Sequence, residues 1–304
     1  MYDVIIVGGG PAGTSAAMLL GRCIRKVLLF DSGLGRNRWS NHMNGFLSRD
    51  GYNPVEFIKL GREELKKYPI EVKNQIVKSV KRVDNYFEVT DRDDQCYIAR
   101  KVLLATGLKD RLPEIPGIEE KYGKSVHHCP YCDGWESRNK PLGAYGKGRD
   151  AVGLSLSLKT WSSDVTLYTD GTRKLRREDS ALLEANDIKI CTAPIERLEG
   201  AGSELAAVIL QGGRSMKCEA LFFSTGSEQQ CDLATSLGCE FTSKGVVRTY
   251  KNQQTNIPGL YVAGDASRDM QLVIVAASEG TKAGVMINKE LQEEFRLQIT
   301  DVRV

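Results

Sequence analysis

Two cysteines separated by two residues stand near the middle of the chain, in Cys129-Pro-Tyr-Cys132, and Asp133 directly follows the second one. Two thiols at this spacing can close into a small disulfide ring and open again, with thiolate as the attacking species. The thiolate pKa of such a pair can be lowered, particularly at a helix start. A carboxylate beside the second cysteine can carry the proton that this cycle must move. The segment therefore predicts a redox-active dithiol with Asp133 as its acid/base group.

Two of the three histidines in the chain, His127 and His128, precede this pair. Each can share the proton transfer, and each can equally be an ordinary polar loop residue. A Cys-x-x-Cys can also be half of a structural zinc site, which needs four ligands. The sequence has no second Cys-x-x-Cys and no histidine pair at metal-binding spacing, and Cys218, Cys231 and Cys239 are not suitably spaced. Redox chemistry is favoured, and no metal site is predicted.

A glycine-rich segment near the N-terminus, Gly8-Gly9-Gly10-Pro11-Ala12-Gly13, has the G-x-G-x-x-G spacing of dinucleotide-binding turns. An apolar run at residues 4–7 precedes it, as expected of a buried parallel strand, and small residues typical of a packed helix follow. Gly8 permits a tight turn, Gly10 lets backbone amides approach a pyrophosphate, and Gly13 lets helix and strand pack closely. Asp31 ends the next predicted strand, where an acid can accept ribose hydroxyls. A first dinucleotide site is predicted here.

This fingerprint alone does not distinguish NAD from FAD, but two later segments do. Ala105-Thr106-Gly107 ends one apolar strand, and Gly264-Asp265 ends another shortly before a long helix over residues 271–291. An aspartate there can bind a ribityl chain, while the helix N-terminus points at the flavin ring. The ordered set predicts FAD, bound by Gly8, Gly10, Pro11, Ala12, Gly13, Asp31, Ser32, Arg36, Asn37, Asn41, His42, Ala105, Thr106, Gly107, Gly264, Asp265, Gln271 and Leu272. The four residues of this set at positions 36–42 can also be solvated loop residues.

A second glycine-rich turn, Gly146-Lys147-Gly148-Arg149-Asp150-Ala151, fits G-x-G-x-x-A, so a second dinucleotide can bind there. Asp170 ends the next predicted strand, where an acid suits a free ribose diol and repels a 2′-phosphate. Four later cations can offset this repulsion or form a solvated helix face: Arg173, Lys174, Arg176 and Arg177. The pattern predicts inefficient use of NADPH and leaves NADH or a second FAD open.

The β-α-β pattern of the first site starts again near residue 141, which predicts an α/β protein with two doubly wound, Rossmann-like, three-layer ββα domains. Short strands are expected over residues 76–104, with others at 165–169, 206–210 and 220–223. The predicted FAD domain is discontinuous, with residues 1–113 plus 246–304. Residues 114–245 are predicted to form the second domain, which carries the dithiol. Segments 113–117 and 243–245 are the expected hinges.

Composition limits the remaining classes of function. The chain has 42 basic and 39 acidic residues, a balance that does not indicate nucleic-acid binding. No 18-residue apolar run is present, so no transmembrane helix is expected. The first predicted strand begins at residue 2 or 3, which leaves no room for a signal peptide. Eight cysteines scattered through a long chain are expected to be mostly buried hydrophobes, and the expected location is the cytoplasm.

The segment Cys-x-x-Cys-Asp-Gly between the halves of a discontinuous FAD domain resembles the low-molecular-weight thioredoxin reductases, over essentially the whole chain. This resemblance implies a homodimer in which Cys132 faces the flavin, Cys129 attacks the partner disulfide and Asp133 is the acid/base. Cys-Pro-Tyr-Cys, residues 134–136 and Arg36-Asn37 resemble a subgroup that includes the gliotoxin- and holomycin-type dithiol oxidases and the cyanobacterial diflavin-linked disulfide oxidoreductases. Many of these relatives carry histidine where this chain has Asp133.

The expected function is FAD-dependent thiol-disulfide exchange through Cys129 and Cys132, with Asp133 and His128 assisting. The expected partner is a thioredoxin-like protein or a small dithiol or disulfide. Ferredoxin as electron donor, oxygen as acceptor and ordinary NAD(P)H-dependent thioredoxin reduction stay open as alternatives. A flavin or nucleotide sensor without catalysis is disfavoured by the intact dithiol.

Overall fold

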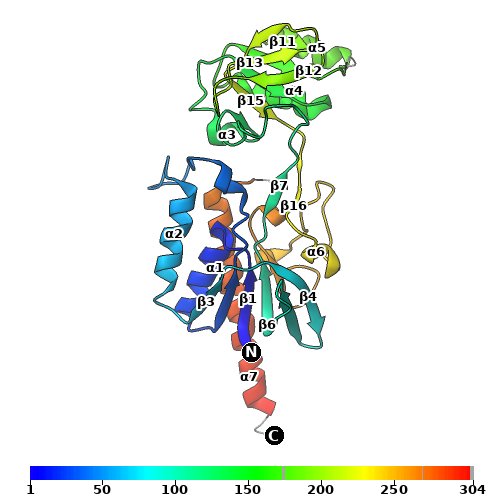
Figure 1. Cartoon of the computed structure of the whole chain (residues 1–304). Helices are drawn as coiled ribbons and strands as arrows, with labels where there is room; N and C mark the ends of the chain where they lie inside the picture. The colour runs from blue at the N-terminus through cyan, green and yellow to red at the C-terminus, as the bar shows by residue number, and fades with distance from the viewer. Residues whose placement is uncertain (173–174, 269, 302–304) are drawn as a thin grey trace.

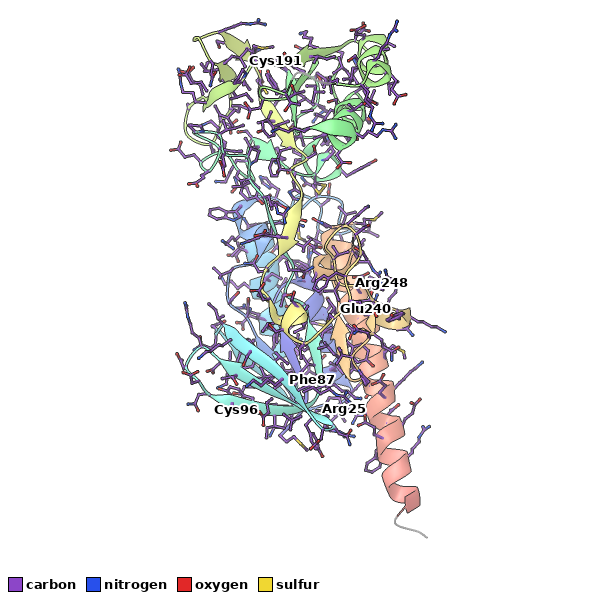
Figure 2. The ribbon with its side chains drawn as sticks, turned by 90° about the vertical axis from the view of Figure 1, so that its right-hand side faces the viewer. Arg25, Phe87, Cys96, Cys191, Glu240 and Arg248 are labelled. Atoms are coloured by element: carbon purple, nitrogen blue, oxygen red, sulfur yellow. A yellow bond between two sulfur atoms is a disulfide. The ribbon has the colours of Figure 1, made fainter. Side chains whose placement is uncertain are left out.

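The computed structural model describes residues 1–172, 175–268 and 270–301, and it shows two lobes joined by a narrow two-stranded ribbon (Figure 1). Both chain ends belong to the first lobe, whereas the middle of the chain forms the second. The view turned by 90° shows the same narrow connection (Figure 2). The architecture is α/β with two doubly wound units, as the sequence predicted.

The first lobe is built on a seven-stranded sheet in the order β3-β2-β1-β6-β5-β4, with β17 paired to β6. Its parallel part contains β1 (Tyr2–Val7), β2 (Val27–Phe30), β3 (Ile70–Lys73), β6 (Cys96–Leu104) and β17 (Leu260–Val262). Its antiparallel part adds β4 (Val77–Val83) and β5 (Tyr86–Asp91). Every residue of β2 is buried, which explains its unbroken apolar sequence, since both faces of the sheet are covered.

Helices cover one face of this sheet: α1 (Pro11–Arg22), α2 (Pro54–Leu65) and α7 (Val273–Asp301). On the opposite face, α6 (Leu233–Ser236) packs into a cluster that includes the fully buried Phe87 of β5. The sequence analysis did not predict α2. Its local signal is nevertheless present, because the Asn53 side chain accepts hydrogen bonds from the amides of Val55 and Glu56, and Pro54 is the first helical residue.

The second lobe holds a five-stranded parallel sheet in the order β11-β10-β9-β15-β8. Its strands are β8 (Val126–His127), β9 (Leu142–Tyr145), β10 (Val165–Tyr168), β11 (Ile188–Cys191) and β15 (Ala220–Phe223). One face packs against α4 (Gly148–Leu158) and α5 (Arg177–Ala185). The other face is covered by an antiparallel sheet of β12 (Ile195–Glu199), β13 (Ala207–Leu210) and β14 (Ser215–Lys217). The strand expected at 206–210 therefore belongs to a separate layer.

The chain crosses between the lobes at β7 (Leu108–Asp110) and β16 (Ser227–Gln229), which pair antiparallel. The expected second boundary at residues 243–245 is wrong, because Leu233, Cys239 and Val247 pack into the core of the first lobe. Figure 2 shows Glu240 and Arg248 on that lobe. The Ser-Lys-Gly sequence that suggested a linker forms a turn instead, closed by a 3.0 Å hydrogen bond from the Gly245 amide to the Thr242 carbonyl.

The expected first hinge, at residues 113–117, is also displaced. Ile115 and Ile118 are buried in the second-lobe core, and the Leu198 amide donates a hydrogen bond to the Pro116 carbonyl. The crossing therefore lies just before this segment, at β7. Three short 3-10 helices also occur in the described ranges: η1 (Arg36–Trp39), η2 (Lys251–Gln253) and η3 (Asp265–Ser267). No helix within the described ranges is long and apolar enough to cross a membrane.

Candidate active site

A cavity of about 540 Å³ opens where the parallel strands of the first lobe end. The segments that follow β1, β2, β6 and β17 line it together with α2 and the start of α7, at the sheet edge where α/β proteins bind ligands. Of the residues predicted to bind FAD, the lining includes Gly8, Gly10, Pro11, Ala12, Asp31, Ser32, Arg36, Asn37, Ala105, Thr106, Gly107, Gly264, Asp265, Gln271 and Leu272. Asn41 and His42 do not line it; the Asn41 carbonyl and the His42 ring bond within the 40–53 loop.

The glycine turn at the base of the cavity has the geometry that the fingerprint requires. Gly8 has φ +113°, and a Cβ there would collide with the Ala105 carbonyl. A Cβ on Gly13 would collide with the Gly8 carbonyl, so Gly13 serves close helix packing. At Gly10 a Cβ would meet nothing within 4 Å. Because Gly10 caps α1 without a side-chain hydrogen bond, the first-turn amides of the helix are left for an anion such as a pyrophosphate.

Two of the cationic side chains that line the cavity are arginines paired with acids. Arg36 comes from η1, and Arg62, which the sequence analysis missed, comes from α2 and pairs with Asp31. The Nε atoms of both side chains are buried and have no hydrogen-bond partner within the described part of the chain. Buried N–H groups that lack a partner are costly, so these donors fit an anionic, oxygen-rich ligand. The residues present therefore fit FAD.

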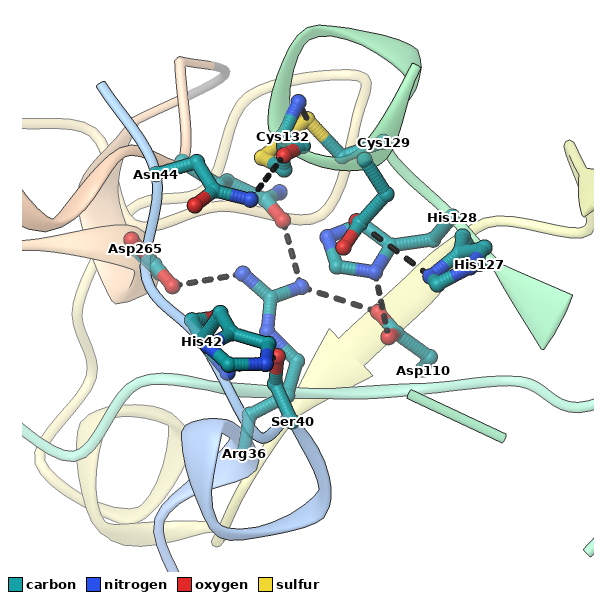
Figure 3. The surroundings of a disulfide bond; sticks show 12 residues. Arg36, Ser40, His42, Asn44, Asp110, His127, His128, Cys129, Cys132 and Asp265 are labelled. Atoms are coloured by element: carbon teal, nitrogen blue, oxygen red, sulfur yellow. Dashed lines mark hydrogen bonds and ion pairs between the residues drawn. A yellow bond between two sulfur atoms is a disulfide. The ribbon is translucent and has the colours of Figure 1, made fainter. Parts of the chain in front are cut away.

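The two cysteines of the second lobe form a disulfide at α3 (Pro130–Asp133). Cys129 caps this helix, and its sulfur accepts a 3.2 Å hydrogen bond from the Cys132 amide. Both cysteines are partly exposed. Asn44, from a loop of the first lobe, donates a 2.8 Å hydrogen bond to the Cys132 carbonyl (Figure 3). The disulfide therefore lies where the lobes meet.

Each of the two histidines before the disulfide pairs with a different aspartate (Figure 3). His127 Nδ1 lies 3.3 Å from Asp133 Oδ2, and His128 Nδ1 lies 3.2 Å from Asp110 Oδ2. His127 is buried against Phe222, whereas the His128 side chain is 30% exposed. Burial, with a further contribution from Arg36, lowers the pKa of His128 to about 4. The His128 imidazole is therefore neutral at pH 7.

A chain of charged groups connects the cavity with the histidine beside the disulfide. Arg36 Nη1 lies 2.9 Å from Asp110 Oδ1, and Arg36 Nη2 lies 2.6 Å from Asp265 Oδ2. Arg36 also donates a 2.6 Å hydrogen bond to Gln271 Oε1. Burial opposes the arginine charge, but the facing Asp265 and Asp110 outweigh it and raise the pKa of Arg36. A charged Arg36 thus contacts both the predicted flavin site and the carboxylate that holds His128.

Comparison with known proteins identifies the family. A model of the pyridine nucleotide-disulphide oxidoreductases matches residues 2–280. The chain belongs to this family. It is an FAD-dependent disulfide oxidoreductase of the thioredoxin reductase type.

Three similar proteins illustrate this relationship. The thioredoxin reductase tcpT of Claviceps purpurea is 32% identical, with 98% of this chain and 97% of the relative covered. The thioredoxin reductase sirT of Leptosphaeria maculans is 31% identical, with coverages of 95% and 94%. The solved structure of HlmI matches with a TM-score of 0.95 and 34% identity, over 99% of this chain and 96% of that one. The resemblance to the gliotoxin- and holomycin-type subgroup is thereby confirmed.

The second glycine turn of this disulfide oxidoreductase is followed by an acid that lies among protein donors, as Asp31 does after the first turn. Gly148, with φ +66°, begins α4, and Lys147 caps the helix without a side-chain hydrogen bond. The Asp170 carboxylate accepts a 2.9 Å hydrogen bond from the Tyr145 hydroxyl and a 2.8 Å bond from the Ile195 amide. Both carboxylate oxygens therefore bind protein groups.

The charged residues around this turn are mostly on the surface. Gly146 is buried, but Arg149 and Asp150 are exposed in the first turn of α4. Arg149 and Arg176 both pair with Glu178. Arg177 begins α5, and the predicted cations Arg173 and Lys174 lie outside the described residues. As for metals, no group of three or more His, Cys, Asp or Glu that could hold an ion occurs in the described ranges.

We expect Asp133→Asn to slow thiol-disulfide exchange while leaving FAD binding unchanged. The substitution keeps the shape of a side chain that faces His127 but removes the titratable group. General acid/base catalysis contributes about 10²–10⁴-fold, and a loss in that range is expected. Stopped-flow reduction of the flavin by a dithiol measures it. The matched control is Asp164→Asn, a surface carboxylate that pairs with Lys189 in the same lobe. An unchanged rate in Asp133→Asn would direct attention to the two histidines.

Proposed function

We propose that this protein passes electrons between FAD, the Cys129–Cys132 pair and a disulfide or dithiol substrate, without efficient use of NADPH. The observation that carries this proposal is the disulfide placed where the lobes meet, joined to the cavity through His128, Asp110 and Arg36. The substrate is a thioredoxin-like protein or a small dithiol. A homodimer, implied by the resemblance, is part of the proposal.

The residues of this chain have separable tasks in this function. Bound FAD supplies an acceptor or donor of two electrons. The α1 N-terminus, Arg36 and Arg62 bind its phosphates and polar groups in the cavity. Cys132 faces the flavin and Cys129 meets the substrate, as in the thioredoxin reductases that the chain resembles. Asp133 and His128 exchange protons with the thiols, because each lies beside the pair and is held by a partner.

We further propose that the two lobes are the functional domains. Residues 1–107 and 230–304 then form the FAD domain, and residues 111–226 form the dithiol domain, with β7 and β16 as the hinge. The narrow two-stranded crossing supports a hinge at this place. The Asn44 bond to Cys132 and the Asp110 contact with His128 both reach the second lobe, and we expect both to break when that lobe rotates about the ribbon.

The second glycine turn supports the expectation that nicotinamides are poor donors. The Asp170 carboxylate already accepts one hydrogen bond at each oxygen, from Tyr145 and from the Ile195 amide. A ribose diol would have to share these oxygens with the protein donors, and a 2′-phosphate would also meet the carboxylate charge. Two unit charges about 4 Å apart repel by about 4 kcal/mol near a protein surface. NADPH is therefore disfavoured more strongly than NADH.

Anaerobic titration of the oxidised flavin tests this proposal. We expect dithiothreitol to bleach the flavin, and NADPH and NADH to leave it oxidised over the same period. Reduced ferredoxin is the fourth reagent, and the nucleotides released on denaturation are identified. Rapid stoichiometric bleaching by NADPH would overturn the proposal in favour of ordinary thioredoxin reduction. More than one FAD released per chain would place a second flavin at the Gly146–Gly148 turn.

One observation favours an ordinary NAD(P)H-dependent thioredoxin reductase as a second candidate. The turn at Gly148 still begins a helix of eleven residues whose first turn is exposed and lacks a side-chain cap. Such a helix start can bind a phosphate group. The same titration separates the candidates, and oxygen consumption in the presence of a dithiol shows whether the protein works as a dithiol oxidase.

A further inference from the structure

Asp110 is a buried carboxylate between the two lobes. It ends β7, the strand that crosses from the first lobe to the second, and its side chain is only 3% exposed. Arg36 of the first lobe pairs with Oδ1 at 2.9 Å. Two groups of the second lobe approach Oδ2: His128 Nδ1, at 3.2 Å, and the Tyr122 hydroxyl, which donates a hydrogen bond. One buried carboxylate therefore binds both lobes.

We propose that Asp110 is a positioning residue that fixes the tautomer and orientation of His128, so that His128 Nε2 accepts the thiol proton when the dithiol closes. This inference rests on the proposed function. An ionised carboxylate can only accept hydrogen bonds. The His128 nitrogen that faces it must therefore carry the hydrogen, and Nε2 keeps the lone pair. In the view of Figure 3 the His128 ring lies between Asp110 and the two cysteines.

The proton balance requires such a group. When the two thiols close, one S–S bond forms, two electrons pass to the flavin and two protons leave the sulfurs. One proton travels with the electron pair, and the protein must accept the other. His128 precedes Cys129 in sequence and is neutral at pH 7, so it can take this proton. In the reverse direction the imidazolium returns it.

The surrounding charges decide how well His128 can hold this proton. Arg36 and His127 disfavour the imidazolium, whereas Asp110 and Asp133 favour it. Asp110 is the carboxylate in direct contact, and it also neutralises Arg36, the nearest cation. A buried aspartate that orients a histidine and stabilises its charged form follows the same physical logic as in the catalytic triad of serine proteases. Loss of the Asp110 charge should therefore raise the free energy of the thiolate–imidazolium pair.

The test is the rate at which a dithiol reduces the flavin of the holoenzyme, followed by stopped-flow absorbance at pH 7 with saturating dithiol. In Asp110→Asn this rate should fall by about 10²-fold, because the group that accepts the thiol proton is no longer oriented and its charged form is no longer stabilised. Tyr122→Phe should raise the rate, because Asp110 loses a competing donor and becomes a stronger acceptor for His128. Asp91→Asn, which removes another buried carboxylate in the first lobe, is the control and should leave the rate unchanged.

A double-mutant cycle separates positioning from a general structural effect. His128→Gln should slow flavin reduction by itself, and Asp110→Asn should cause no further loss in that background. An equal loss of rate with and without His128 would overturn the proposal, as would an unchanged rate in Asp110→Asn. If Asp110→Asn fails to fold, the faster reduction in Tyr122→Phe decides the matter, and a slower or unchanged rate contradicts the proposal. A wild-type flavin that no dithiol reduces would instead defeat the proposed function, whereas a wild-type flavin that is reduced no faster than that of Asp110→Asn would defeat this inference alone.

Discussion

Replacing Cys129 with serine should abolish turnover and leave the Cys132 thiolate beside the flavin, visible as a long-wavelength charge-transfer band. The resemblance to the thioredoxin reductases assigns Cys132 to the flavin side, and the structure joins Cys132 to the first lobe through Asn44. Cys132→Ser should also lose turnover but show no such band, because the remaining thiol is the one assigned to the substrate. Absorbance spectra of the reduced variants, recorded without oxygen, measure the difference.

The matched control for both cysteine variants is Cys96→Ser. Cys96 is an exposed free cysteine at the start of β6, at the far end of the first lobe from the dithiol (Figure 2). This variant should keep the wild-type spectrum and turnover. Equal charge-transfer bands in the Cys129 and Cys132 variants would contradict the assignment of roles. Full turnover without either cysteine would contradict the redox role itself.

Gly10→Val should yield a folded protein that does not bind FAD. The backbone at Gly10 has φ −74° and ψ −172°, which valine adopts without strain, and a Cβ there meets no protein atom within 4 Å. The new side chain would instead occupy the cavity at the first turn of α1. Hydrogen bonds to a charged group contribute about 1.5–3 kcal/mol each, so losing two of them weakens binding about 10²-fold or more. Flavin absorbance after reconstitution, together with circular dichroism, measures this outcome.

Two other glycine substitutions help to interpret the Gly10→Val result, one expected to be harmless and one expected to damage folding. Gly153→Val alters an exposed position of α4 where a Cβ also meets nothing within 4 Å, so it should keep both the fold and the flavin. Gly8→Ala should damage folding, because its Cβ would collide with the Ala105 carbonyl and its φ is positive. A yellow Gly10→Val protein with normal FAD content would show that this cavity is not the flavin site.

The sequence by itself determined the features that depend on neighbouring residues. The glycine spacing at Gly8–Gly13 predicted a tight strand-to-helix turn, because only glycine fits where a Cβ would meet a backbone carbonyl. The fully apolar runs predicted buried parallel strands, and β15 (Ala220–Phe223) was predicted to the residue. The ordered motifs ending at Asp265 predicted a discontinuous cofactor domain, and the two-residue spacing of Cys129 and Cys132 allowed the disulfide that the structure shows.

The tertiary structure decided everything that depends on which surfaces meet. The second domain boundary was misplaced because a polar turn at Ser243–Gly245 looks like a linker, although the residues around it pack into the first-lobe core. The sequence placed Asp170 after a strand where it can face a ribose, but only the structure shows that its two oxygens also accept hydrogen bonds from Tyr145 and from the Ile195 amide, 25 residues away on either side.

Asp110 shows the physical reason most directly. No local pattern marks it, because its partners Arg36, Tyr122 and His128 come from distant segments and from both lobes. Hydrophobic periodicity and turn chemistry are local properties, so they can be read from the order of residues. The pairing of a buried charge depends on the groups that folding brings within a few ångströms, and only the packed structure determines those groups.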